Sequence, residues 1–216
     1  MPVIEILLIR HGETAWNAER RLQGHLDIPL NAEGVRQAAA LGRVLRDEPL
    51  DAIIASDLQR AIQTAQAIAE PHGMAVMIDA GLRERGFGVL EGLLRTEMAA
   101  AFPEAFAAFQ ARDLDACYPS GVNVAETLRE FSARVMQTLS QLVTTGQHKK
   151  IVLVTHGGIL DCVYRVATGM DLSKPRNFDI LNASVNRLIW NGTDFQIKEW
   201  SNVTHLTAPG LDELVR

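Results

Sequence analysis

Short apolar runs alternate along this chain with segments that have helical spacing. Three runs are nearly continuous and are typical of strands buried on both faces of a parallel sheet, namely residues 4–9, 52–55 and 151–154. Residues 185–190 and 195–200 look like two later strands. The Asn-Gly-Thr-Asp sequence between them is a turn signal, so we expect a hairpin.

Between these runs, apolar residues recur every three or four positions. This spacing predicts helices at about residues 35–45, 61–68, 124–142 and 158–168. The third is the clearest, and Asn123 with Glu126 stands where an N-cap and its reciprocal acidic partner would lie.

This alternation predicts an α/β fold, a three-layer α/β/α sandwich whose central sheet is mostly parallel with a late hairpin or antiparallel edge strand. Residues from about 81 to 122 break the alternation. We expect them to form a helical excursion that covers one edge of a site. No linker divides the chain, so residues 1–216 are predicted to form one domain.

Composition narrows the classes of function. The chain has 216 residues, 47% hydrophobic and 22% charged, with a net charge of −5. These values argue against disorder and against broad binding to nucleic acid or an anionic membrane. No apolar run approaches the ~20 residues of a membrane span. Cys117 and Cys162 fit no metal-binding pattern, which favours a reduced, cytoplasmic protein.

The chemistry is expected where the predicted parallel strands end, because ligands of open α/β sheets bind at the carboxyl edge. Arg10 and His11 follow the first strand, Arg60 follows the second, and His156 with Gly157 follows another. Arginine donors match phosphate oxygens, and a neutral imidazole is a competent nucleophile. Together these residues predict a phosphoryl-transfer site.

Two other uses of these histidines compete with that interpretation. A lone histidine at a strand end is often only a hydrogen-bonded structural residue. A metal site would need further ligands, for which Glu13, Asp57 and Asp161 are candidates. The nearby arginines would repel a bound cation, so we predict no metal and no other cofactor.

The segment Leu-Ile-Arg-His-Gly-Glu-Thr at residues 8–14 resembles the opening signature of the histidine phosphatase superfamily, in its phosphoglycerate mutase-like branch. Further blocks similar to that family follow in the family's order at residues 22–34, 56–65, 82–92 and 154–158. The tail, residues 205–216, resembles a bacterial subgroup named probable phosphoglycerate mutases, whose members look more like phosphatases.

The resemblance implies a role for each matching residue. His11 would carry the phosphoryl group, while Glu84 would protonate the leaving oxygen and later deprotonate the attacking water or alcohol. Burial would raise the pKa of Glu84. Three residues would bind the phosphate and its transition state, namely Arg10, Arg60 and His156. The phosphate pocket would be lined by Asn17, Gln23, Gly24 and Gly157. Arg85 and Phe87 would contact the substrate.

The family contains both mutases and phosphatases. Residues 94–115 contain only two arginines, Arg95 and Arg112, and are rich in alanine and phenylalanine. This favours a metal-independent phosphomonoesterase for a small phosphorylated metabolite over a bisphosphoglycerate-dependent mutase. A non-catalytic phospholigand-binding domain is the second alternative. Val122 and Asn123 replace the family's usual Glu-Ser, so its substrate preferences do not carry over. A homodimer is compatible with the sequence.

Overall fold

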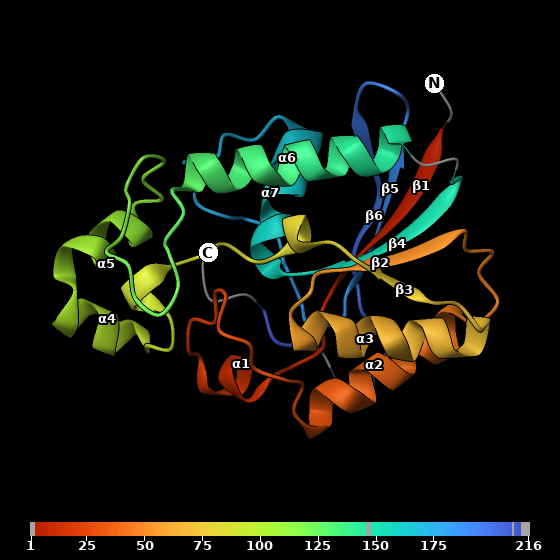
Figure 1. The fold of residues 1–216 in the computed structure, drawn as a ribbon, viewed down its shortest axis with the longest axis horizontal. Helices are drawn as coiled ribbons and strands as arrows, with labels where there is room; N and C mark the ends of the chain where they lie inside the picture. The colour runs from red at the N-terminus through yellow and green to blue at the C-terminus, as the bar shows by residue number, and fades with distance from the viewer. Residues whose placement is uncertain (1–2, 146–147, 209, 213–216) are drawn as a thin grey trace.

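The computed structural model describes residues 3–145, 148–208 and 210–212, and its centre is a six-stranded sheet (Figure 1). The strand order is β3-β2-β4-β1-β5-β6. Their bounds are Ile4–Arg10 for β1, Ala52–Ala55 for β2, Val76–Ile78 for β3, Lys150–Thr155 for β4, Val185–Trp190 for β5 and Phe195–Asn202 for β6.

The sheet has the predicted mixture of directions. Strands β1, β2, β3 and β4 pair in parallel, whereas β5 runs antiparallel to both β1 and β6. The predicted late hairpin is therefore confirmed. The sequence pattern did not indicate β3, an edge strand of three residues whose Met77 and Ile78 are about half exposed.

Helices cover both faces of the sheet, as Figure 1 shows. Helices α2 (Ala32–Leu45) and α3 (Gln59–Ala69) pack on one face, and α6 (Leu128–Thr145) with α7 (Gly157–Thr168) on the other. The side chains of β1 alternate between the two faces of the sheet. Leu7 and Ile9 join the core that α2 and α3 cover, and Ile6 and Leu8 join the core that α6 and α7 cover. This arrangement is the predicted three-layer α/β/α sandwich.

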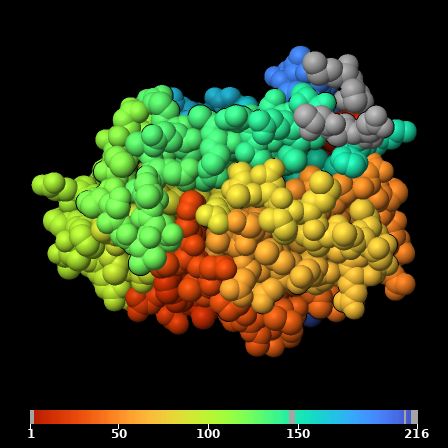
Figure 2. Space-filling view, viewed as in Figure 1, coloured from red at the N-terminus to blue at the C-terminus, as the bar shows by residue number. Residues whose placement is uncertain are grey.

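The excursion of residues 81–122 is helical, as expected, and has its own small core. It contains α4 (Arg95–Ala101), α5 (Pro103–Gln110) and short 3-10 turns at Ala80–Leu82 and Gly88–Leu90. Phe87, Met98 and Phe109 are among the side chains buried within it. Figure 2 shows the excursion at one end of the molecule, next to the red segment that follows β1.

The prediction that a helix begins after Asn123 was wrong. Helix α6 begins at Leu128, and Thr127 with Glu130 forms the reciprocal cap: the Thr127 amide donates to Glu130 Oε2 at 2.9 Å, and the Glu130 amide donates to Thr127 Oγ1 at 3.1 Å. Asn123 instead donates to Glu91 Oε2 at 2.7 Å. Glu126 Oε2 accepts a hydrogen bond from the Gly86 amide of the excursion, and residues 124–127 lie outside the helix.

The remaining elements connect these layers. Helix α1 (Ala15–Glu19) follows β1, and a 3-10 turn at Glu70–His72 follows α3. Within the ranges described, no helix combines the length and apolar composition that a membrane crossing requires. Cys117 is exposed and Cys162 is buried, and both are free thiols. Residues 213–216 of the tail resemblance lie outside the described residues.

Candidate active site

The carboxyl ends of β1, β2 and β4 meet at one edge of the sheet. Arg10 pairs in register with Thr155, and the His11 amide donates to the Thr155 carbonyl at 2.9 Å. The Ser56 amide donates to the Val154 carbonyl at 3.0 Å, which brings the end of β2 to the same place. The predicted convergence of His11 and His156 follows, since their ring centroids are 5.1 Å apart.

His11 is held in one tautomer. Its Nδ1 lies 2.7 Å from the carbonyl oxygen of Gly12, and a carbonyl only accepts hydrogen bonds, so Nδ1 carries the proton. The Nε2 atom therefore has the free electron pair. Burial, and then the charges of Arg60 and Arg10, lower the pKa of His11 well below its usual value. His11 is thus a neutral imidazole at pH 7, with the electron pair on Nε2.

His156 has the opposite tautomer. Arg60 Nε donates to His156 Nδ1 at 3.3 Å, which leaves the proton on Nε2, 2.8 Å from Ser56 Oγ. Burial is the main cause that lowers the pKa of His156, and the charge of Arg60 adds to it. His156 is completely buried. In this structure His156 accepts a hydrogen bond from Arg60. The binding of phosphate by His156 remains a prediction.

The two predicted phosphate-binding arginines are both buried and held by backbone carbonyls. Arg60, in the first turn of α3, donates to the carbonyls of Gly24 at 2.7 Å and Leu26 at 2.8 Å. Arg10 donates through Nη1 to the carbonyls of Ile180 at 2.7 Å and Leu211 at 3.0 Å. Such fixed arginines can present positive charge without rearranging.

A cavity opens next to this sheet edge. Its lining contains every predicted site residue except Arg10 and His156, namely His11, Asn17, Gln23, Gly24, Arg60, Glu84, Arg85, Phe87 and Gly157. The other lining residues are Arg21, Leu22, Phe109, Arg112, Leu128, Phe131, Gly158, Asp161, Arg176 and Ile180. Five arginines and only two carboxylates line the cavity, which suits an anionic ligand.

Asn17 and Gln23 are positioned by the loop that follows β1. Thr14 caps α1, and its Oγ1 lies 3.1 Å from Asn17 Oδ1 and 3.0 Å from Gln23 Oε1. Gly24 has a φ of +54°, and a Cβ there would lie 2.1 Å from Glu91 Oε1. Only glycine fits this turn, whose carbonyl accepts from Arg60.

Glu84 is a buried residue, not part of a charged surface turn. Its Oε1 accepts from the Arg85 amide at 2.7 Å, and its Oε2 accepts from the Gly158 amide at 2.9 Å. The side chain lines the cavity and only 8% of the residue is exposed. The backbone of two segments, far apart in sequence, thus fixes the carboxyl group beside the cavity.

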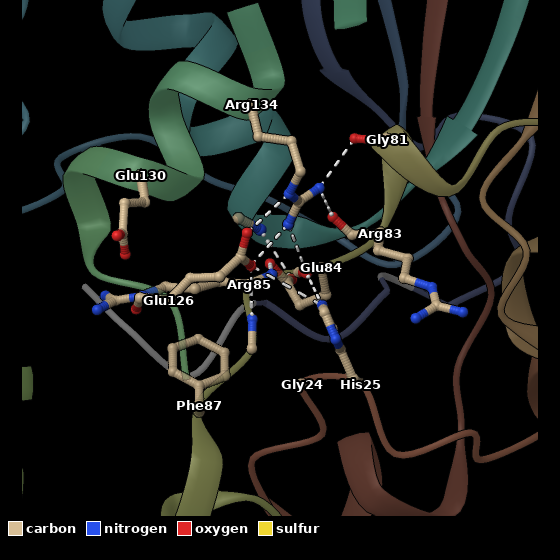
Figure 3. Close-up of polar contacts among 12 residues, drawn as sticks. Gly24, His25, Gly81, Arg83, Glu84, Arg85, Phe87, Glu126, Glu130 and Arg134 are labelled. Atoms are coloured by element: carbon tan, nitrogen blue, oxygen red, sulfur yellow. Dashed lines mark hydrogen bonds and ion pairs between the residues drawn. The ribbon is translucent and has the colours of Figure 1, made fainter. Parts of the chain in front are cut away.

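Arg134 of α6 forms hydrogen bonds to the backbone of the segment that carries Glu84, as Figure 3 shows. Its guanidinium donates to the carbonyls of Gly81, Arg83 and Glu84 at 2.9–3.1 Å. It also binds both oxygens of Glu126 at 2.7 Å. Sequence reasoning missed Arg134, because a single arginine on a long amphipathic helix carries no local signal.

His25 completes this attachment. Its Nε2 lies 2.7 Å from the Glu84 carbonyl oxygen, to which it donates (Figure 3). In this contact His25 is a structural residue that holds the backbone of Glu84. On the cavity side, Arg85 lies over the rings of Phe87 and Tyr118, with Cζ 5.4 Å and 5.1 Å from the centroids.

Residues 210–212 of the C-terminal tail also support the site. The Leu211 carbonyl accepts from Arg10, and the Asp212 carboxylate accepts from Arg176, which lines the cavity. The Asn182 side chain donates to the His11 carbonyl at 3.0 Å, and its backbone amide donates to Leu211. These long-range contacts had no signal in the local sequence pattern.

The carboxylates considered as metal ligands have other partners. Glu13 accepts from Asn31 at 2.8 Å, Asp57 pairs with Arg83 at 2.6 Å, and Asp161 pairs with Arg112 at 2.6 Å. Among the residues that the structure describes, no three His, Cys, Asp or Glu side chains gather in a group that could hold a metal ion.

The chain is similar over most of its length to proteins named as mutase-like proteins and phosphatases. The chain is 38% identical to the phosphoglycerate mutase-like protein 4 of Arabidopsis thaliana over 209 residues, covering 95% of this chain and 88% of that protein. It is 37% identical to the metal-independent phosphoserine phosphatase of the same plant, covering 96% and 85%.

A solved structure with the same fold is a mutant phosphoserine phosphatase from Entamoeba histolytica in complex with phosphoserine. The TM-score is 0.81 at 27% identity, and the match covers 94% of this chain and 99% of that chain. The family model of the histidine phosphatase superfamily, branch 1, matches residues 6–203. With its strand-end histidines and arginine-lined cavity, the chain belongs to the histidine phosphatase superfamily.

Proposed function

We propose that this protein is a metal-independent phosphomonoesterase that acts on a small phosphorylated metabolite through a phosphohistidine at His11. The observation that carries the proposal is the tautomer of His11, whose Nδ1–H is fixed by Gly12 while Nε2 is free beside an arginine-lined cavity. The phosphatases among the relatives support the same reaction class.

In the first step, His11 Nε2 forms a bond to phosphorus as the ester P–O bond breaks. Glu84 donates a proton to the departing oxygen, which leaves as the alcohol. Water then attacks the phosphohistidine, Glu84 takes a proton from that water, and the P–N bond breaks to release phosphate. His11 returns to its neutral form, so the cycle balances without another reactant.

Positive charge at the cavity stabilises the transferring phosphoryl group. Arg60 is rigid because Gly24 and Leu26 hold it, and the positive N-terminal end of α7, which begins at Gly157, lies at the same end of the sheet. Loose phosphoryl transition states are stabilised mainly by such positioning and charge. This fixed charge is the basis for proposing a reaction that needs no metal.

The excursion favours hydrolysis over a mutase reaction. Of residues 94–115, Phe109 and Arg112 line the cavity, and Arg112 is already bound to Asp161. A mutase must retain a doubly phosphorylated intermediate, which calls for more uncommitted positive groups. The cavity lining also includes the apolar side chains of Leu128 and Phe131 of α6.

The test is hydrolysis of p-nitrophenyl phosphate from pH 5 to 8 in the presence of a chelator. We expect phosphate release by the wild type and none by His11→Ala, with unchanged folding of the variant checked by circular dichroism. Absence of wild-type turnover across this range refutes the phosphatase and favours a phospholigand-binding domain. Bisphosphate-dependent interconversion of 2- and 3-phosphoglycerate identifies a mutase instead.

A further inference from the structure

A buried glutamine on α2 has no part in the chemistry proposed for His11 and Glu84. Helix α2 lies wholly within the described residues, and of its buried side chains only that of Gln37 is polar. The residue is 3% exposed. An amide group is costly to bury on an apolar helix face unless it forms a hydrogen bond, so the partner of Gln37 shows what this side chain does.

The partner of Gln37 lies in the loop that follows β1. Gln37 Oε1 accepts a hydrogen bond from the Glu13 amide at 2.8 Å. That amide belongs to the peptide unit that joins Gly12 to Glu13. The carbonyl oxygen of the same unit lies 2.7 Å from His11 Nδ1 and accepts its proton. Gln37 therefore bonds the peptide unit that sets the tautomer of His11.

The two bonds on this peptide unit depend on each other. A trans peptide unit is planar, and its N–H and C=O groups point in opposite directions. A bond that fixes the direction of the Glu13 N–H therefore also fixes the direction of the Gly12 carbonyl. The bonds from His11 Nδ1 to the carbonyl and from the amide to Gln37 form one chain, in which each bond polarises the next.

Close contact between backbones brings Gln37 within reach of this unit. A Cβ at Gly34, one turn before Gln37, would lie 2.0 Å from the Glu13 carbonyl oxygen, and a Cβ at Gly12 would lie 2.6 Å from the Gly34 carbonyl oxygen. Asn31, the N-cap of α2, donates from its amide to the Glu13 carbonyl at 3.0 Å. The start of α2 thus lies directly against the loop and holds it.

The neighbouring peptide unit is held by another helix. The Gly12 amide donates to Thr64 Oγ1 of α3 at 3.0 Å, and that hydroxyl donates to the Arg60 carbonyl at 2.7 Å. This contact fixes the unit that joins His11 to Gly12, which does not contain the carbonyl facing Nδ1. The direction of that carbonyl therefore depends on Gln37.

Resting on the proposed phosphatase function, we propose that Gln37 is a positioning residue for the nucleophile. It holds the Gly12–Glu13 peptide unit so that the carbonyl keeps the proton of His11 on Nδ1. When this bond is lost, the unit can turn away and the proton can move to Nε2. An imidazole protonated at Nε2 has no electron pair there to attack phosphorus. Gln37 acts through His11 and does not touch the phosphate.

The test is Gln37→Met, which removes the acceptor and keeps the length of the side chain. Nitrogen-15 NMR with labelled histidine distinguishes protonated from unprotonated ring nitrogens, and His11→Ala identifies the signals of His11. We expect the proton on Nδ1 in the wild type and partly on Nε2 in Gln37→Met. The kcat/KM for p-nitrophenyl phosphate should fall by about 2- to 13-fold, the effect of one neutral hydrogen bond. The dissociation constant of orthophosphate, measured by calorimetry, should not rise.

The matched control is Gln63→Met, because Gln63 Oε1 of α3 accepts from the backbone amide of Leu30, also at 2.8 Å. This variant should leave the tautomer of His11 and kcat/KM unchanged. Unfolding midpoints show whether each variant folds. If Gln37→Met does not fold, Gln37→Asn replaces it, since the shorter amide cannot reach Glu13 and the same change of tautomer is expected.

An unchanged tautomer and unchanged kcat/KM in the Gln37 variant overturn the assignment and leave the phosphatase intact. The same change of tautomer in Gln63→Met also overturns it, because the effect is then a general loosening of the loop. Failure of the wild type to hydrolyse any ester refutes the phosphatase, whereas a tautomer change confined to the Gln37 variant still supports the positioning of His11. A wild-type His11 protonated on Nε2 refutes both.

Discussion

Replacing Gly158 by alanine should separate the role of Glu84 from that of the phosphate site. A Cβ at residue 158 would lie 2.1 Å from Glu84 Oε1 and 3.1 Å from Phe131 Cε1. The buried carboxyl group must therefore move, which breaks the 2.9 Å bond that Oε2 accepts from the Gly158 amide. The helix itself tolerates the change, because alanine has a better helix propensity than glycine.

The size of the effect follows from the lost hydrogen bond. A hydrogen bond that positions an uncharged carboxyl group contributes about 0.5–1.5 kcal/mol, which corresponds to about 2- to 13-fold in rate where Glu84 must donate its proton. Proton donation matters for a poor leaving group such as an alkyl alcohol. It matters far less for p-nitrophenolate, which leaves without a proton.

The assay compares kcat/KM for glycerol 2-phosphate and for p-nitrophenyl phosphate. In Gly158→Ala, hydrolysis of the alkyl ester should fall by that factor and hydrolysis of the aryl ester should change little. Glu84→Gln should show the same pattern, and the double variant should be no worse than Glu84→Gln alone. An equal fall for both esters, or additive effects in the double variant, refutes the reasoning.

Three further predictions concern stability and support of the site. The pKa values of His11 and His156 are lowered in the folded protein, so only the unfolded chain takes up their protons below pH 6.5. The free energy of unfolding should therefore fall from pH 6.5 to 5.5, with a slope approaching about 1.4 kcal/mol per pH unit for each residue. Urea unfolding over that range should show a flatter profile when both residues are replaced by asparagine. Arg134→Met should lower the free energy of unfolding by about 3–5 kcal/mol, since it leaves a partly buried carboxylate unpaired, and should lower kcat for alkyl esters; unchanged kcat would contradict its positioning role. Thr127→Ala should lower the free energy of unfolding by about 1 kcal/mol, because it removes the N-cap of α6. Asn123→Ala should show no loss of helix by circular dichroism, because Asn123 does not cap this helix.

The strand ends were predictable because the signal is local. The apolar run before Arg10 identifies a buried strand, and parallel pairing then brings His11 next to His156 at one edge. The phosphoryl-transfer chemistry expected of both residues rests on their types and stays a prediction. Here the hydrophobic pattern and the general position of ligand sites were sufficient.

Contacts between distant segments were beyond the local pattern. Glu84 was recognisable only through the family resemblance, because its burial depends on Gly158 and Arg134, more than 45 residues away in each case. The wrong cap at Asn123 has the same cause, since Glu126 fits a capping box locally but is bound by Arg134 in the fold. Tertiary contacts there outweigh local propensity.

The most direct test of the central claim is to locate the phosphoryl group during turnover. Quenching the hydrolysis of p-nitrophenyl phosphate with base and mapping peptides by mass spectrometry should show the group on His11. It should accumulate in Glu84→Gln, because this aryl ester phosphorylates His11 without a proton donor whereas activation of the attacking water is slowed. His11→Ala should show none. A phosphoryl group on another residue, or a phosphoenzyme that persists in His11→Ala, contradicts the account.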